Sequence, residues 1–195
     1  MARVRTEGLL VGEWACLGLL AEGPSHGFAV AKRLAPEGDV GRVWSLSRPL
    51  TYRAIGILSA GGFIEAVGEE PGTAGGPRTI YAVTRSGRRS LRQWLARPVA
   101  HLRDVRSELL LKLVLCQLAG VDAAPLLGAQ RAVFAPMAET LAAEARRRPH
   151  DPVTLWRAES SRSVVRFLDR AERAAARPGG PAAGDRKRPA ARSRR

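Results

Sequence analysis

The sequence predicts a mainly helical protein of the α+β class, in which a small N-terminal domain precedes a long helical region. Apolar residues recur at three- and four-residue steps over most of the 195-residue chain. Two short β-branched or apolar runs lie close together between residues 63 and 83. A composition of 45% hydrophobic and 26% charged residues is typical of a globular protein.

The first two expected helices lie in the N-terminal 34 residues. Residues 9–20 have the spacing of an apolar helix, which stops at a Gly-Pro pair. Ser25 is expected to cap a second, shorter helix, in which Lys32 and Arg33 are left toward solvent or DNA. After a loop, residues 43–46 could form a short strand that leads into a third helix.

The third helix has the most informative pattern. Ser47 occupies the N-cap position and a proline follows within the first turn. The stripe expected to face the core consists of Leu50, Ala54, Ile57, Leu58 and Gly61. The opposite face carries Arg48, Tyr52, Ile55, Gly56 and Ser59, with Thr51 and Arg53 on its flanks. Arginine can pair with guanine edges, and tyrosine and serine can reach phosphates. Taken alone, the pattern fits an ordinary surface helix and a major-groove helix about equally well.

Two strands and a flap are expected after this helix. Residues 63–67 and 79–83 form the strand candidates, and the glycine- and proline-rich segment 69–77 is too long for a tight hairpin turn. Thr84 is expected to cap a further helix. The order helix, helix, helix, strand, flap, strand is that of a winged helix-turn-helix, in which the third helix enters the major groove of DNA.

The second half of the sequence predicts long helices that leave part of their apolar surface uncovered. Asp104 is expected to cap residues 105–118, which are apolar on most sides and should be buried between elements or subunits. Residues 122–148 and 152–175 are expected to pair as an antiparallel hairpin, and Pro136 should kink or split the first of them. The surplus apolar surface suggests dimerisation. The candidate dimerisation residues are Leu109, Leu113, Leu155, Val165 and Leu168.

These patterns divide the chain into three parts. We expect a winged-helix DNA-binding domain at residues 9–97, a helical dimerisation domain at 98–176 and a disordered basic tail at 177–195. Seven basic residues and Asp185 give the tail a charge of +6, which leaves +8 of the total +14 for the rest of the chain. Because the body is itself basic, a polyanionic partner such as nucleic acid is favoured, and the tail is expected to add nonspecific DNA affinity.

The sequence carries no pattern of a catalytic or metal site, so we expect a protein that is not an enzyme and uses no cofactor. The three histidines are scattered, without cysteines or carboxylates at metal-ligand spacing. The glycine-rich residues 72–76 are not followed by the lysine and hydroxyl residue of a phosphate loop.

No signal peptide or membrane-spanning run is present, which predicts a cytoplasmic, nucleoid-associated protein without a membrane partner. Cys16 and Cys116 are expected to be reduced and buried.

The chain resembles the PadR family of bacterial transcriptional regulators from residue 10 to about residue 173. The stretches that carry the resemblance are LLAEGPSHGF at 19–28, GRVWSLSRPLTYRA at 41–54 and GPRTIYAVT at 76–84, followed by long C-terminal helices. The resemblance implies a homodimer that represses neighbouring genes by occupying promoter palindromes. It also implies, as for some members, release from DNA by a small aromatic or drug-like effector.

The resemblance assigns residues to a DNA interface. On the recognition helix it implies Ser47, Arg48, Thr51, Tyr52 and Arg53, and on the wing and its strand Arg78, Thr79 and Tyr81. It places His26 near the DNA backbone, and Ser25 and Lys32 complete the candidate DNA-binding residues. The sequence departs from the family at Phe28, where tyrosine is frequent, and at Gly56 and Ser59, where charged helix formers are usual.

A second function class remains open, namely a winged-helix module or adaptor that binds proteins and has only nonspecific DNA affinity. Such a module predicts an apolar or acidic recognition face. Arg48, Tyr52 and Arg53 instead favour DNA, although Tyr52 could also pack on a neighbouring helix.

Overall fold

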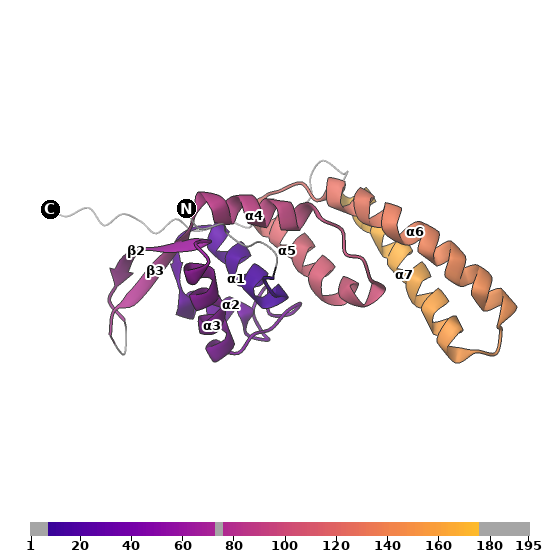
Figure 1. The fold of residues 1–195 in the computed structure, drawn as a ribbon, viewed down its shortest axis with the longest axis horizontal. Helices are drawn as coiled ribbons and strands as arrows, with labels where there is room; N and C mark the ends of the chain where they lie inside the picture. The colour runs from indigo at the N-terminus through magenta and orange to yellow at the C-terminus, as the bar shows by residue number, and fades with distance from the viewer. Residues whose placement is uncertain (1–7, 73–75, 176–195) are drawn as a thin grey trace.

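The computed structural model describes residues 8–72 and 76–175 of the chain. Its N-terminal part consists of three helices and a small sheet, and further helical segments follow, of which α6 and α7 extend away from it (Figure 1). The N-terminal elements are α1 (Val11–Ala21), β1 (Ser25–His26), α2 (Gly27–Leu34), α3 (Arg48–Ala60), β2 (Ile64–Glu70) and β3 (Arg78–Val83). Their order matches the winged helix-turn-helix expected from the sequence.

The core of this domain is built around α1, which is apolar on nearly every side and almost entirely buried. Trp14 of α1 stacks on Trp94, with ring centroids 5.0 Å apart and ring planes inclined by 8°. Gly18 allows Leu115 to pack directly on the α1 backbone, because an added Cβ would lie 2.5 Å from a Leu115 methyl carbon. Cys16 and Cys116 are both free and buried in this core, as expected.

The sheet is antiparallel, with strand order β1-β3-β2. Strands β2 and β3 confirm the two predicted strands and project from the helices as a wing (Figure 1). The pairing register shifts between Ala66 and Gly68, so Val67 has no partner on β3. Residues 73–75 of the predicted flap lie outside the described residues.

Two local predictions for the segments that precede α3 are wrong. Residues 43–46 form no strand, because the amides of Val43 and Trp44 both donate to the carbonyl of Val40 in a turn. Ser25 does not cap α2, because it belongs to β1, where it pairs with Tyr81. The N-cap is His26, whose Nδ1 accepts a hydrogen bond from the amide of Ala29 at 3.1 Å.

A joint connects the winged helix to the C-terminal helices. Helix α4 (Arg85–Ala96) is capped by Thr84 as predicted, and a short linker leads to the 3₁₀ helix η1 (Leu102–Asp104), the π-helix η2 (Val105–Leu109) and α5 (Leu110–Ala119). Asp104 makes no capping hydrogen bond with its side chain, since the chain is already helical before it. Leu111 and Leu115 of α5 join the core of the winged helix. This confirms the expected burial of the helix between other elements.

The last two helices, α6 (Ala124–Arg147) and α7 (Pro152–Ala175), form a long hairpin that extends away from the winged helix (Figure 1). Helix α6 runs through Pro136 without interruption, so the proline does not split it. Pro136 is exposed, which leaves solvent to satisfy the carbonyl that its missing N–H would have bonded. A second core joins the hairpin to the linker and contains Val99, Val105, Leu109, Leu126, Leu127, Phe134 and Leu168.

The proposed division of the chain at residues 97 and 98 stays a prediction, and the basic tail lies outside the described residues. Within the part of the chain that the structure describes, no helix is long and apolar enough to cross a membrane. The same residues contain no cluster of three or more histidine, cysteine or acidic side chains that could hold a metal ion.

Candidate nucleic-acid interface

Helix α3 buries a different stripe from the predicted one. Its buried residues are Thr51, Ala54, Ile55 and Leu58, which also follow three- and four-residue spacing. Leu50 is 49% exposed and Ile57 is also exposed, so both predictions of burial are wrong. Thr51 is fully buried because its hydroxyl donates to the carbonyl of Ser47 at 3.1 Å, which satisfies the polar group inside the core. Thr51 therefore does not lie on the exposed face of α3.

The exposed face of α3 is cationic and open. It carries Arg48, Tyr52, Arg53 and Gly56, and the helix contains no acidic residue. Among the described residues, neither Arg48 nor Arg53 forms an ion pair. No atom would meet a Cβ at Gly56 within 4 Å, which leaves this side of the helix clear.

Tyr52 both packs on a neighbouring helix and remains accessible. Its side chain lies over Gly27 at the start of α2, where an added Cβ would stand 2.7 Å from Cε1 of Tyr52. The residue is nevertheless 49% exposed. The two alternatives for this residue, packing or an accessible position on the α3 face, are therefore compatible.

Phe28 joins the first turn of α2 to α3 and to the wing. The Cζ atom of Arg48 lies 5.0 Å from the centroid of its ring, and the Cζ atom of Arg78 lies 5.1 Å from the same centroid. Both distances are within the range of cation–π contacts. Three segments that are distant in sequence thus place two guanidinium groups on one aromatic ring.

A cavity of about 450 Å³ lies beside this cluster, between α2 and the segment that enters α3. It is lined by apolar atoms of Phe28, Ala31, Ala35, Pro36 and Leu46 and by Lys32, Ser47 and Arg48. The side chain of Ser47 makes no capping hydrogen bond, so its hydroxyl does not bond the first backbone amides of α3. Lys32, which also lines the cavity, is an exposed residue of α2.

His26 ties the start of α2 to the end of β2. Its Nε2 lies 2.9 Å from Oε1 of Glu70, the last residue of β2, while its Nδ1 accepts from the amide of Ala29. Because Nδ1 is an acceptor, the ring proton is on Nε2 and is donated to Glu70. The side chain is largely enclosed by these partners, so it acts first as a tie between α2 and β2. Of the other sheet residues in the predicted site, Ser25, Thr79 and Tyr81 are partly buried.

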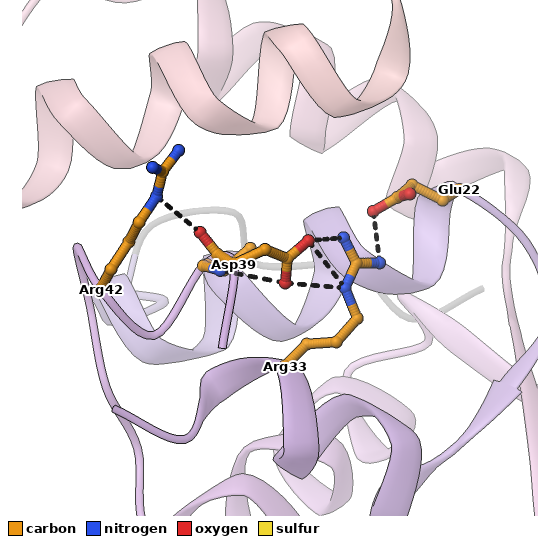
Figure 2. Close-up of polar contacts among 5 residues, drawn as sticks. Glu22, Arg33, Asp39 and Arg42 are labelled. Carbon is orange, nitrogen blue, oxygen red and sulfur yellow. Dashed lines mark hydrogen bonds and ion pairs between the residues drawn. The ribbon is translucent and has the colours of Figure 1, made fainter. Parts of the chain in front are cut away.

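Arg33 does not join the cationic face, although the sequence places it next to Lys32. It bridges two carboxylates, with Nη2 2.6 Å from Oδ2 of Asp39 and Nη1 2.7 Å from Oε1 of Glu22 (Figure 2). The hydrogen bond from Arg33 is the main reason that the pKa of Asp39 is held below its ordinary value. Nε of Arg42 donates to the backbone carbonyl of Asp39 at 3.1 Å. This network fixes the loop between α2 and α3 and leaves Lys32 as the exposed cation.

The sequence of this domain matches a known family. Residues 16–93, from α1 into α4, match the model of the transcriptional regulator PadR-like family. This part of the chain is similar to PadR-like transcriptional regulators. This match confirms the resemblance found in the sequence over residues 16–93, and it agrees with the expectation that the protein is not an enzyme, because the family consists of regulators.

Two solved structures are similar to the PadR-like chain. The crystal structure of Bacillus subtilis PadR in complex with operator DNA shares 20% sequence identity, covers 85% of this chain and 99% of its own, and has a TM-score of 0.44. The crystal structure of Bacillus subtilis PadR shares 19% identity, covers 91% of this chain and 100% of its own, and has a TM-score of 0.39. No curated protein sequence matches the chain.

The predicted dimerisation residues of the PadR-like chain are divided between its own core and its surface. Leu109 and Leu168 are fully buried in the second core, and Leu113 and Val165 pack against that core. Leu155 is exposed at the start of α7. Its exposed neighbours Val153 and Trp156, the latter 73% exposed, were not among the predicted residues. Both residues follow the Asp-Pro pair at the start of α7 closely. This position could have indicated their exposure, because residues in the first turn of a helix are often partly free of the core.

Proposed function

We propose that the PadR-like protein binds promoter DNA as a homodimer and represses transcription. In this proposal α3 enters the major groove, and the wing formed by β2, β3 and their connecting loop contacts the neighbouring backbone or minor groove. The observation that carries the proposal is the exposed face of α3, which carries Arg48, Tyr52 and Arg53 together with an open glycine, on a helix that has no acidic residue.

The chemistry of this face favours DNA over a protein partner. Arg48 and Arg53 can form bidentate hydrogen bonds with guanine or contact phosphates, and Tyr52 can donate to a phosphate. Lys32 of α2 and Arg78 of β3 add cations near Arg48, because Lys32 lines the same cavity as Arg48 and Arg78 shares the Phe28 ring with it. Leu50 and Ile57 are also exposed on α3, so the arginines and the absence of acidic residues, and not a lack of apolar side chains, favour DNA over a protein partner.

The α6–α7 hairpin supports the homodimer in this proposal. Val153, Leu155 and Trp156 expose apolar side chains over the first turn of α7, and a second copy of the chain is the partner that would bury them. A two-fold dimer would place the two α3 helices in successive major grooves, about one helical turn apart. An effector would act by changing the distance between the two wings.

Fluorescence anisotropy with DNA from the protein's own upstream region tests the proposal. The full chain is compared with the Tyr52→Ala/Arg53→Ala variant and with a chain that ends at Arg177, on upstream and scrambled duplexes at several salt concentrations. Arg92→Ala is the charge-matched control, because Arg92 is exposed on α4. We expect the upstream duplex to bind more tightly than the scrambled one, and the preference to be lost only in the double variant.

The alternative function predicts a different result. A protein-interaction module would bind both duplexes weakly and equally, would not respond to the double variant, and would lose its DNA affinity on removal of the tail. Sedimentation equilibrium tests the dimer separately. A monomer at micromolar concentration would contradict the two-site arrangement.

A further inference from the structure

Phe28 occupies the point where the recognition helix and the wing approach one another. Its ring, 38% exposed, comes from the first turn of α2. Arg48 is the first residue of α3 and Arg78 is the first residue of β3. Their guanidinium carbons lie 5.0 Å and 5.1 Å from the Phe28 centroid, so both cations rest on the same ring.

Two guanidinium groups that share one ring repel each other in the free protein and together attract a nearby anion. The electron-rich face of Phe28 partly offsets the repulsion and restricts where the two side chains lie. Glu70 stands opposite Arg78 in the sheet, and its Oε1 is 2.9 Å from Nε2 of His26. The cluster is therefore held together by the ring and by the sheet, before any ligand is present.

An anion can reach this cluster from the adjoining cavity. Phe28 and Arg48 line that cavity of about 450 Å³ together with Lys32 and Ser47, and no acidic residue lines it. The planar fork of an arginine matches the oxygens of a phosphate. Phenylalanine has no hydroxyl group to offer to that phosphate, so its contribution must be to hold the two arginines.

We propose that Phe28, Arg48 and Arg78 form one site for a phosphodiester of the DNA backbone, and that Phe28 is its positioning residue. The site would clamp the backbone between α3 and the wing and thus set how deeply α3 enters the groove. This inference rests on the proposed DNA-binding function. It gives Phe28 a role in that function, although its side chain has no polar atom.

Substitutions of Phe28 in the full-length protein test the site. Phe28→Leu keeps an apolar side chain and removes the aromatic ring, while Phe28→Tyr keeps the ring and is the matched control. Binding to the upstream duplex and to a scrambled duplex is measured by fluorescence anisotropy over a range of salt concentrations. We expect Phe28→Leu to weaken both duplexes equally, by about two- to fivefold. Phe28→Tyr should bind at least as well as the native chain.

Double-variant cycles separate positioning from simple loss of contact. If Arg48 and Arg78 share a phosphate, the variant that lacks both should lose less affinity than the product of the two single losses. That coupling should disappear in the Phe28→Leu background. Removal of both arginines should reduce the slope of log K against log salt by about one, because one phosphate contact is lost.

Three results would overturn the inference. The first is unchanged affinity and salt dependence in Phe28→Leu, and the second is independent effects of the two arginines whether or not Phe28 is present. The third is a loss confined to the upstream duplex, which would assign the arginines to base recognition. The proposed function fails by another criterion, the absence of any preference for upstream DNA, and the scrambled duplex tests the phosphate site even then. Far-UV circular dichroism checks that each variant is folded.

Discussion

Nζ of Lys112 lies 2.7 Å from Oε1 of Glu108, one helical turn earlier in the chain. Lys112 is only 1% exposed, and its ammonium group also donates to the carbonyl of Arg97 at 2.7 Å and lies 4.7 Å from the Trp94 ring centroid. Since Trp94 stacks on Trp14 of α1, this buried cation connects the core of the winged helix to the segment that leads to the hairpin.

Removal of the carboxylate should destabilise this joint. In Glu108→Ala the buried ammonium keeps a carbonyl and a ring but loses its counter-ion, which should lower the free energy of unfolding by about 1–3 kcal/mol. The value is below that of a fully enclosed pair because Glu108 is partly exposed. Urea denaturation measures the change. The Glu108→Gln/Lys112→Met variant should recover most of the loss, and a double variant no more stable than Glu108→Ala would contradict the explanation.

Lys112 should also make stability depend on alkaline pH. Burial is the main cause that lowers the pKa of Lys112 below its ordinary value of 10.5. Below pH 10.5 and above the native pKa, the unfolded chain therefore binds more protons than the folded one, so the Lys112 contribution to stability rises with pH. The free energy of unfolding of the native chain, measured against Lys112→Met, should increase as the pH rises toward 10.5. Parallel curves for the two proteins would contradict this prediction.

The two thiols should be unreactive in the folded protein. Burial, with a smaller contribution from Glu13, raises the pKa of Cys16 to about 12, and burial also raises the pKa of Cys116. Because the thiolate is the reactive form, neither residue should be alkylated by iodoacetamide at pH 8 under native conditions. Mass spectrometry should show two modifications after unfolding in guanidinium chloride. Modification of the folded chain at the rate of free cysteine would show that this core opens.

A pair of glycine substitutions should have opposite effects on stability. In Gly27→Ala the new methyl group would stand 2.7 Å from Cε1 of Tyr52, so we expect a loss of about 1–3 kcal/mol and a displaced tyrosine. In Gly56→Ala the methyl group meets no atom within 4 Å, and an exposed helix interior should gain up to about 1 kcal/mol. Thermal unfolding followed by circular dichroism measures both. Equal shifts in the two variants would mean that Tyr52 does not pack on Gly27.

The elements of this fold could be predicted where a local pattern determines them. The Thr84 cap, the two wing strands and the starts of the long helices depend on residues within one turn of the feature. The buried side of α3 could not be predicted in the same way, because hydrophobicity alone favours Leu50 over Thr51. The hydroxyl of Thr51 is acceptable in the core only because it bonds to the carbonyl of Ser47.

The parts of the site that were missed depend on contacts between distant segments. Arg33 of α2 pairs with Glu22 and Asp39, at separations of 11 and 6 residues, and both partners lie outside that helix. The two arginines on Phe28 come from another helix and from a strand. A sequence pattern identifies these arginines as cations near an interface, but it does not show which of them are neutralised within the protein.

Gln130 should be the most sensitive polar residue of the second core. It is fully buried, and its side-chain amide bonds both backbone groups of Val99, accepting from the N–H at 2.7 Å and donating to the carbonyl at 2.9 Å. Gln130→Leu would leave two buried backbone groups without partners, and we expect the free energy of unfolding to fall by about 2–5 kcal/mol. Gln117→Leu, at an exposed position of α5, is the matched control and should change it by less than about 0.5 kcal/mol. Urea denaturation of both variants measures the difference. Similar stabilities for the two would mean that solvent reaches Val99 and that the hairpin is not fixed to the linker by this contact.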